Sequence, residues 1–387
     1  LLYPYLYGEG ENLFHIGIYE TDSANYFFFD IAHIMGDGMT MNVLFEDLNQ
    51  LYLGKAVEPE TYTFYEYILD EKDRDARGLR TKNEAYFRGL MNDFKVRKSI
   101  LTRKDCYSLE HGVDADLKGR FTSLNRRNVS AFCKKLGVSE NVFFLTAYNL
   151  SIGLFSNEKD TVSSSIHSGR TDSRWTRLAG PLFLTYFFRN KEGVDQTVPE
   201  LLKTNAKQIM DTMRCYISNL HADEMFFQYQ GDILNIDTVG GYPAERQRMQ
   251  LDSLPFHLQV FTDAKGYYYE LRYWENRFDT RQLQDFLTVM ESLMDAMQDE
   301  ILVRRLSRRL PDRLFPLHYT ITVEELNQAA KGQLVTGVDG KEPVKVYVFD
   351  ENCRKKPFGA WGELYVMDYK PEQMLDEITN PYGPGKL

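Results

Sequence analysis

The order of apolar patterns along this chain constrains its fold more strongly than any other feature of the sequence. Short runs rich in aromatic and β-branched residues lie at 26–32, 161–166 and 267–273, whereas apolar residues recur at helical spacing over 139–155 and 280–297. The first pattern is typical of strands and the second of amphipathic helices. Because strands and helices alternate along the chain, we expect an α/β fold.

Turn residues and further periodic segments complete this order. Asp263-Ala264-Lys265-Gly266 has the composition of a hairpin turn between two strands. We expect the strand over 26–32 to be buried on both faces. We also expect Ser139 to cap the helix over 139–155. Further helices are expected over 64–70, 83–94, 128–136 and 198–217, with a charged connector over 71–80.

The chain changes character from Pro311 onwards. A glycine-rich patch over 332–340 precedes the alternating residues 344–349, which predict a strand. We therefore expect a domain boundary near Leu310. Because the sequence starts with Leu1-Leu2-Tyr3-Pro4, without an initiator methionine, and ends in a loop rich in proline and glycine, we also expect a truncated protein.

Charge and cysteine usage argue against several classes of function. The formal net charge is −10, and the densest basic stretch, Arg304 to Arg313, is interpreted as a solvated helix end or linker, so no nucleic-acid partner is expected. No apolar stretch approaches the ~20 residues that a membrane span needs. The cysteines lie far apart and form no metal-binding or disulfide pattern, which favours a reducing cytoplasm and no bound metal. They are Cys106, Cys133, Cys215 and Cys353.

His33 has the most distinctive position of the seven histidines. It stands at the end of the strand expected over 26–32, on a loop that contains Gly38, and four residues before Asp37. We expect its imidazole to face a channel, where it can act as a general base near neutral pH. The alternative is a structural histidine beside a buried strand.

Asp37 is expected to turn inward and to fix the same loop. Since an unpaired buried carboxylate is costly, it needs a cation, and Arg170 in Ser168-Gly169-Arg170 is the candidate. The alternative is that Asp37 merely caps the helix that begins near Thr40, a residue that can itself serve as an N-cap.

The segment from Asp30 to Met41 resembles the His-His-x-x-x-Asp-Gly motif of nonribosomal peptide synthetase condensation domains, which are relatives of chloramphenicol acetyltransferase. His33 corresponds to the second motif histidine, and Ala32 replaces the first. Further along, Ser168-Gly169-Arg170 resembles the Gly-Arg turn of that family. Residues 180–189 and 269–279 resemble its Gly-x-Phe-Val-Asn-Thr…Arg strand, with Leu184 in place of the asparagine, and its late hairpin with the Arg-Phe signature.

The resemblance covers about residues 1–300 and implies a chloramphenicol acetyltransferase-like fold with two lobes and mixed sheets. It implies a truncated N-terminal lobe over 1–112, which carries the motif, and a C-terminal lobe over 113–310. The tail resembles the late core of an adenylation domain, so residues 311–387 are expected to be a small, β-rich and partial adenylation segment. This segment lacks the phosphate-binding loop of its family, so no adenylation activity is expected.

The resemblance also implies an activity, namely amide-bond formation between a donor acyl or peptidyl thioester and an acceptor aminoacyl thioester. His33 would be the catalytic residue, and Asp37, Gly38 and Arg170 would support the active site. No cofactor is expected to bind directly, since both substrates are carried on the phosphopantetheine of partner carrier domains. An adjacent adenylation domain is the other expected partner.

Two alternatives stay open. One is a catalytically inactive fragment or scaffold that only docks carrier domains, an interpretation favoured by Ala32, Leu184 and the short N-terminal portion. The other is a free-standing acyltransferase that uses a soluble acceptor, which the adenylation-like tail argues against.

Overall fold

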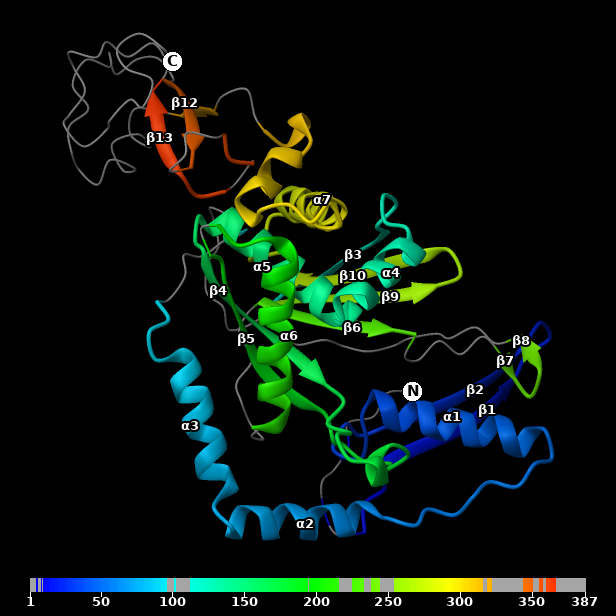
Figure 1. Ribbon diagram of the computed structural model, residues 1–387. Coiled ribbons are helices and arrows are strands. Elements are labelled where there is room, and N and C mark those ends of the chain that lie inside the picture. The colour runs from blue at the N-terminus through cyan, green and yellow to red at the C-terminus, as the bar shows by residue number, and fades with distance from the viewer. Residues whose placement is uncertain are drawn as a thin grey trace.

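A computed structural model describes residues 5, 8, 10–95, 101, 112–193, 195–215, 225–232, 238–243, 254–315, 319–321, 344–350, 355–357 and 360–366. Figure 1 shows a small N-terminal lobe, two helices that lead away from it, and a larger lobe built on a sheet. A separate small sheet follows at the far end of the larger lobe, next to the C-terminus.

The first lobe contains the strands β1 (Phe14–Glu20) and β2 (Asn25–Ile31), which are antiparallel, and the helix α1 (Gly38–Tyr52). The strand expected over 26–32 is therefore present. The expectation that it is buried on both faces is wrong, since its first three residues are exposed and its others are only half-buried. The physical reason is that β2 pairs with β1 alone among the described residues, and no side chain of this two-stranded sheet is fully buried.

Two helices, α2 (Phe64–Ala76) and α3 (Leu79–Met91), connect the lobes. The prediction of a charged connector over 71–80 is wrong, because nearly all of this segment is helical. Its charges lie on solvated helix faces, where residues three or four apart can pair. Arg74, for example, binds Glu71 over 2.8 Å between Nη1 and Oε1.

Arg189 anchors the end of α3 on the larger lobe. Its guanidinium is only 3% exposed and donates to the carbonyl oxygen of Leu90 and to Asp93, both at 2.6 Å, and also to Asp160. Hydrogen bonds from Arg189 and Lys191 hold the pKa of Asp93 well below its usual range, at about 2. The link between the lobes is therefore fixed by charge as well as by packing.

The second lobe is built on a six-stranded sheet of order β3-β10-β9-β6-β4-β5. It is mixed, because β6 runs parallel to both β4 and β9 while the other neighbours are antiparallel. The expected hairpin is confirmed as β9 and β10. The strands are β3 (Asp114–Arg120), β4 (Asp160–His167), β5 (Leu184–Lys191), β6 (Met225–Gly231), β9 (Phe256–Asp263) and β10 (Gly266–Trp274).

Four helices cover one side of this sheet (Figure 1). The central helix α5 is buried along almost its whole length, which explains why it is apolar all round rather than amphipathic. Ser139 caps it as expected, by accepting from the backbone N–H of Val142. The helices are α4 (Arg126–Leu136), α5 (Glu140–Ser156), α6 (Val198–Arg214) and α7 (Thr280–Met297).

The chain then leaves the core through two short 3-10 helices, η2 (Val303–Arg309) and η3 (Asp312–Leu314). Their leucine and valine side chains are buried in the core of the second lobe, whereas the arginines of 304–313 are exposed. This agrees with the interpretation of that basic stretch as a solvated segment.

The small sheets complete the fold. The strands β11 (Tyr319–Ile321), β12 (Val344–Phe349) and β13 (Glu363–Val366) form the C-terminal sheet, in which β12 coincides with the strand expected over 344–349. The hairpin of β7 (Thr238–Val239) and β8 (Tyr242–Pro243) lies against α1. In the described part of the chain, no helix is long and apolar enough to cross a membrane. Cys133 and Cys215 are free thiols; Cys106 and Cys353 lie outside the described residues.

Candidate active site at the junction of the two lobes

The turn between β2 and α1 brings the motif residues to the second lobe. Asp37 is the N-cap of α1, with its Oδ1 accepting from the backbone N–H of Thr40 at 2.9 Å. Thr40 Oγ1 in turn accepts from the backbone N–H of Asp37 at 3.2 Å, which completes a capping box. The helix thus begins at Gly38, and the expectation that Thr40 is the N-cap is wrong because the carboxylate three residues earlier takes that place.

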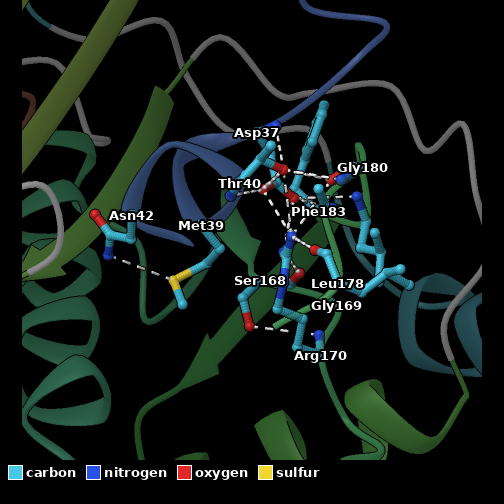
Figure 2. A network of polar contacts seen from close by, with 12 residues as sticks. Asp37, Met39, Thr40, Asn42, Ser168, Gly169, Arg170, Leu178, Gly180 and Phe183 are labelled. Carbon is cyan, nitrogen blue, oxygen red and sulfur yellow. Dashed lines mark hydrogen bonds and ion pairs between the residues drawn. The ribbon is translucent and has the colours of Figure 1, made fainter. Parts of the chain in front are cut away.

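The predicted ion pair between Asp37 and Arg170 is present (Figure 2). Arg170 donates from Nη1 to Oδ2 at 2.8 Å and from Nη2 to Oδ1 at 3.0 Å, a bidentate geometry. The side chains are only 3% and 4% exposed. The backbone N–H groups of Leu182 and Phe183 also donate to Oδ2, at 3.0 and 3.1 Å. Both oxygens of the buried Asp37 carboxylate therefore have a cationic partner and a hydrogen-bond donor, although Arg170 Nε is buried without a hydrogen bond to any described residue.

Gly169 is required by the close approach of two segments. Its φ is +72°, and a Cβ atom there would lie 1.7 Å from the carbonyl oxygen of Leu182. The same turn lets Arg170 donate to the carbonyl oxygens of Ser168 at 3.0 Å and Leu178 at 2.8 Å. The sequence Ser168-Gly169-Arg170 thus folds so that the guanidinium reaches across to the first lobe.

Thr40 links the lobes a second time. Its hydroxyl accepts from the backbone N–H of Gly180 at 3.0 Å and lies 2.9 Å from the carbonyl oxygen of the same residue, to which it can donate. Sequence reasoning missed this role, because the contact joins positions 140 residues apart.

His33 lies in the turn itself and is exposed to solvent. Its ring centroid is 5.2 Å from that of Phe183, with an angle of 54° between the ring planes. The imidazole was expected to face a channel, and the structure shows it exposed to solvent. The turn follows a two-stranded sheet, and the ring contact found for His33 among the described residues is with Phe183 of the second lobe. Ala32, at the position of the first motif histidine, is buried.

A second histidine close to the turn was not singled out from the sequence. His167, at the end of β4, accepts on Nδ1 from the backbone N–H of Gly169 at 3.0 Å. Burial lowers the pKa of His167, so this imidazole is neutral near pH 7. Its position two residues before Gly169 is the signal that could have drawn attention to it.

Taken together, these contacts bring His33, Asp37 and Arg170 to one junction, with Gly38 exposed as the first residue of α1. An exposed imidazole on a rigid turn can accept a proton from, or donate a hydrogen bond to, a group that arrives between the lobes. The carboxylate and the guanidinium are occupied by each other and by backbone groups, so they serve to hold the turn. The arrangement suits proton transfer by one side chain.

A family model described as "Condensation domain" matches residues 6–216 of this chain. Bacitracin synthase 3 of Bacillus licheniformis is 24% identical over 189 residues, which are 47% of this chain and 3% of the synthase. Surfactin synthase subunit 1 of Bacillus subtilis (strain 168) is 22% identical over 263 residues, or 65% of this chain and 7% of that subunit. The chain thus spans only a small part of these curated relatives.

Solved structures show the same fold. The condensation domain from monacolin K polyketide synthase aligns with a TM-score of 0.59 at 15% identity, over 75% of this chain and 74% of that one. The epimerization domain from the third module of tyrocidine synthetase B aligns with a TM-score of 0.58 at 14% identity, over 74% and 72%. At these identities the likeness concerns the two-lobed α/β fold alone.

Proposed function

The chain belongs to the condensation-domain family, since the family model spans more than half of its 387 residues, and from this premise we propose that it forms an amide bond between two substrates carried as thioesters. The donor is an acyl or peptidyl group and the acceptor is an aminoacyl group. The carrier-protein domains that hold them on phosphopantetheine are the proposed partners, together with an adjacent adenylation domain.

The observation that carries the proposal is the His33 turn, held at the lobe junction by the Asp37–Arg170 pair. In the proposed reaction the acceptor amine attacks the donor carbonyl carbon, the new C–N bond forms and the C–S bond breaks. His33 either accepts the proton that the amine loses or stabilises the tetrahedral intermediate by hydrogen bonding. The donor carrier leaves as a thiol. A positioned acid–base group contributes about 10²–10⁴-fold.

Asp37, Gly38 and Arg170 are proposed as supporting residues. The first and last fix the turn through their ion pair, and Gly38 starts α1 directly behind it. We also propose the lobe boundaries 1–112 and 113–310, with residues 311–387 as part of an adenylation domain. The small antiparallel C-terminal sheet supports the last assignment. The free thiols of Cys133 and Cys215 support a cytoplasmic location.

The test is amide formation from a loaded donor carrier and a loaded acceptor carrier, followed by mass spectrometry of the carrier-bound product. We expect product with the unchanged chain, and a rate lower by about 10²-fold or more in His33→Ala. His15→Ala is the matched control, because His15 is a partly exposed histidine on β1 that pairs with Asp30 and makes no ring contact with Phe183 among the described residues. Product formation by His33→Ala at the unchanged rate would remove His33 from the mechanism.

A second candidate function is a catalytically inactive scaffold that docks carrier domains. It is favoured by the exposure of His33 and by the buried Ala32 at the position of the first motif histidine. The same assay separates the two functions. A scaffold would bind a loaded carrier but form no amide, and His33→Ala would bind equally well.

A further inference from the structure

Phe183 is the side chain that contacts the imidazole of His33 from the opposite lobe. It is half-buried, directly precedes β5, and its ring centroid lies 5.2 Å from that of His33 (Figure 2 shows Phe183 beside the ion pair). We infer that Phe183 is a positioning residue, whose ring orients the His33 imidazole and so ties the reacting group of the first lobe to the second lobe. This inference rests on the proposed function for its kinetic consequence, but the contact itself can be tested without activity.

No second ring contact of the His33 imidazole is found in the described part of the chain. In a functional histidine, a hydrogen bond at one ring nitrogen commonly sets the state of the other. No hydrogen bond or ion pair joins the His33 ring to any described residue, so the Phe183 ring is the group that limits its rotation. Nearby backbone contacts, such as the Met35 N–H to the Ala32 carbonyl at 2.8 Å, shape the turn but leave the side chain free to rotate.

The Phe183 backbone is itself fixed by the carboxylate that caps α1. Its N–H donates to Asp37 Oδ2 at 3.1 Å, and the N–H of Leu182 donates to the same oxygen at 3.0 Å. Asp37 follows His33 by only four residues. The Phe183 backbone is therefore bonded to the same buried carboxylate that caps the helix after the His33 turn, which brings the two rings close together.

The size of the effect follows from the kind of contact. Aromatic pairs contribute modestly, and their loss corresponds to a rate change of about 2- to 10-fold. A residue that acts only by orienting the imidazole should change kcat and leave KM unchanged, whereas a residue that binds substrate should change KM as well. Phe183→Tyr keeps the aromatic ring, so we expect its kcat to equal that of the unchanged chain.

The experiment uses the full chain labelled with ¹³C and ¹⁵N in histidine, whose seven side chains are few enough to assign, with His33→Ala identifying the His33 signals. We expect the ring-current shift of the His33 carbon-bound protons to disappear in Phe183→Leu and to remain in Phe183→Tyr. Phe187→Leu is the matched control, because Phe187 is a half-buried phenylalanine on β5, the strand that Phe183 directly precedes. Kinetics with loaded carriers should show the 2- to 10-fold loss of kcat in Phe183→Leu alone.

Unchanged His33 shifts in Phe183→Leu would overturn the inference, and so would changed shifts with an unchanged kcat. Thermal melting of each variant establishes that it is folded, and Phe183→Met replaces the leucine variant if that one does not fold. If the unchanged chain forms no amide, the proposed function fails while the shifts still decide whether Phe183 orients His33.

Discussion

Asp37 combines two roles that sequence reasoning had treated as alternatives. An ionised carboxylate is an acceptor on both oxygens and can take several hydrogen bonds at once. Asp37 Oδ1 accepts from the backbone N–H that the helix cap provides and from Arg170 Nη2. Asp37 Oδ2 accepts from Arg170 Nη1 and from two backbone N–H groups of the second lobe. The cation pair and the helix cap are therefore compatible, and both depend on this single side chain.

Removing the Asp37 carboxylate should destabilise the protein strongly. Asp37→Ala leaves the buried guanidinium of Arg170 without its partner, which typically costs about 3–5 kcal/mol. Denaturant unfolding of the full chain measures this cost. Asp116→Ala is the control, because Asp116 faces Lys118 at 3.5 Å with both side chains largely exposed, and we expect less than about 0.5 kcal/mol there. Equal losses in the two variants would argue against a buried pair.

Gly169 and Gly137 offer a matched pair for testing the close approach at the Gly-Arg turn. Both have φ near +70°, but a Cβ at Gly169 would collide with the Leu182 carbonyl, whereas nothing lies within 4 Å of one at Gly137. Gly137→Ala should cost about 1 kcal/mol, the penalty of the left-handed backbone alone. Gly169→Ala should cost more than about 3 kcal/mol or prevent folding. Similar unfolding midpoints would show that the turn can relax.

Local sequence was informative where the charge or hydrogen-bonding groups of a side chain can be paired in only a few ways. The Asp37–Arg170 pair could be predicted because a buried carboxylate next to a turn needs a cation. The exposure of His33 could not, because it depends on what packs over the turn and not on the turn itself. Thr40 and Phe183 were missed for the same reason, since their partners lie far away in the sequence.

At the scale of elements, length and periodicity decided which predictions succeeded. The helix over 280–297 agrees with α7 at both ends, because eighteen residues give several turns of apolar repeat. The strand β3 was missed, since its sequence Asp-Ala-Asp-Leu-Lys-Gly-Arg is polar. This segment forms a strand because it pairs with the apolar strand β10. The connector expected over 71–80 failed because charged residues were taken as a loop signal.

The sheet of β1 and β2 leaves much apolar surface uncovered. Fifteen of the nineteen exposed large apolar side chains in the described part of the chain belong to the first 69 residues, and Ile18 on β1 is 72% exposed. Such a surface favours association between molecules. We expect Ile18→Lys to lower self-association of the full chain in light scattering by a factor of about two or more, with little change in melting temperature. Val113→Lys, at an exposed site of the second lobe, is the control. Equal scattering of both variants would place the contact elsewhere.

At the scale of the whole molecule, the C-terminal sheet is attached to the end of α5. The backbone N–H of Trp361 donates to the Phe155 carbonyl at 2.7 Å, one of the last carbonyls of that helix. Lys356 is only 5% exposed and donates from Nζ to Asn157 Oδ1 at 3.3 Å. A cation at a helix C-terminus is favourable. Sequence analysis located the strand over 344–349 but gave no indication of this attachment, which joins segments about 200 residues apart.

Glu192 lies at the same attachment and makes its stability depend on pH. Burial raises the pKa of Glu192 to about 7, although Lys159 and Lys356 act to lower it. In the unfolded chain the carboxyl titrates near 4.5. Between these two pH values the folded protein binds the extra proton, so the free energy of unfolding falls as pH rises from about 4.5 through about 7.

Glu192→Gln should remove this dependence, because the amide is neutral at every pH. We expect the variant to match the unchanged protein at pH 5 and to be more stable at pH 8, by about 1–3 kcal/mol after allowance for partial solvation. Melting temperatures at pH 5, 6, 7 and 8 measure the difference, and Glu20→Gln, at an exposed position of β1, is the control. A constant offset between the two proteins across this range would mean that Glu192 stays ionised in the folded state, and the pH dependence would then have to originate in another group.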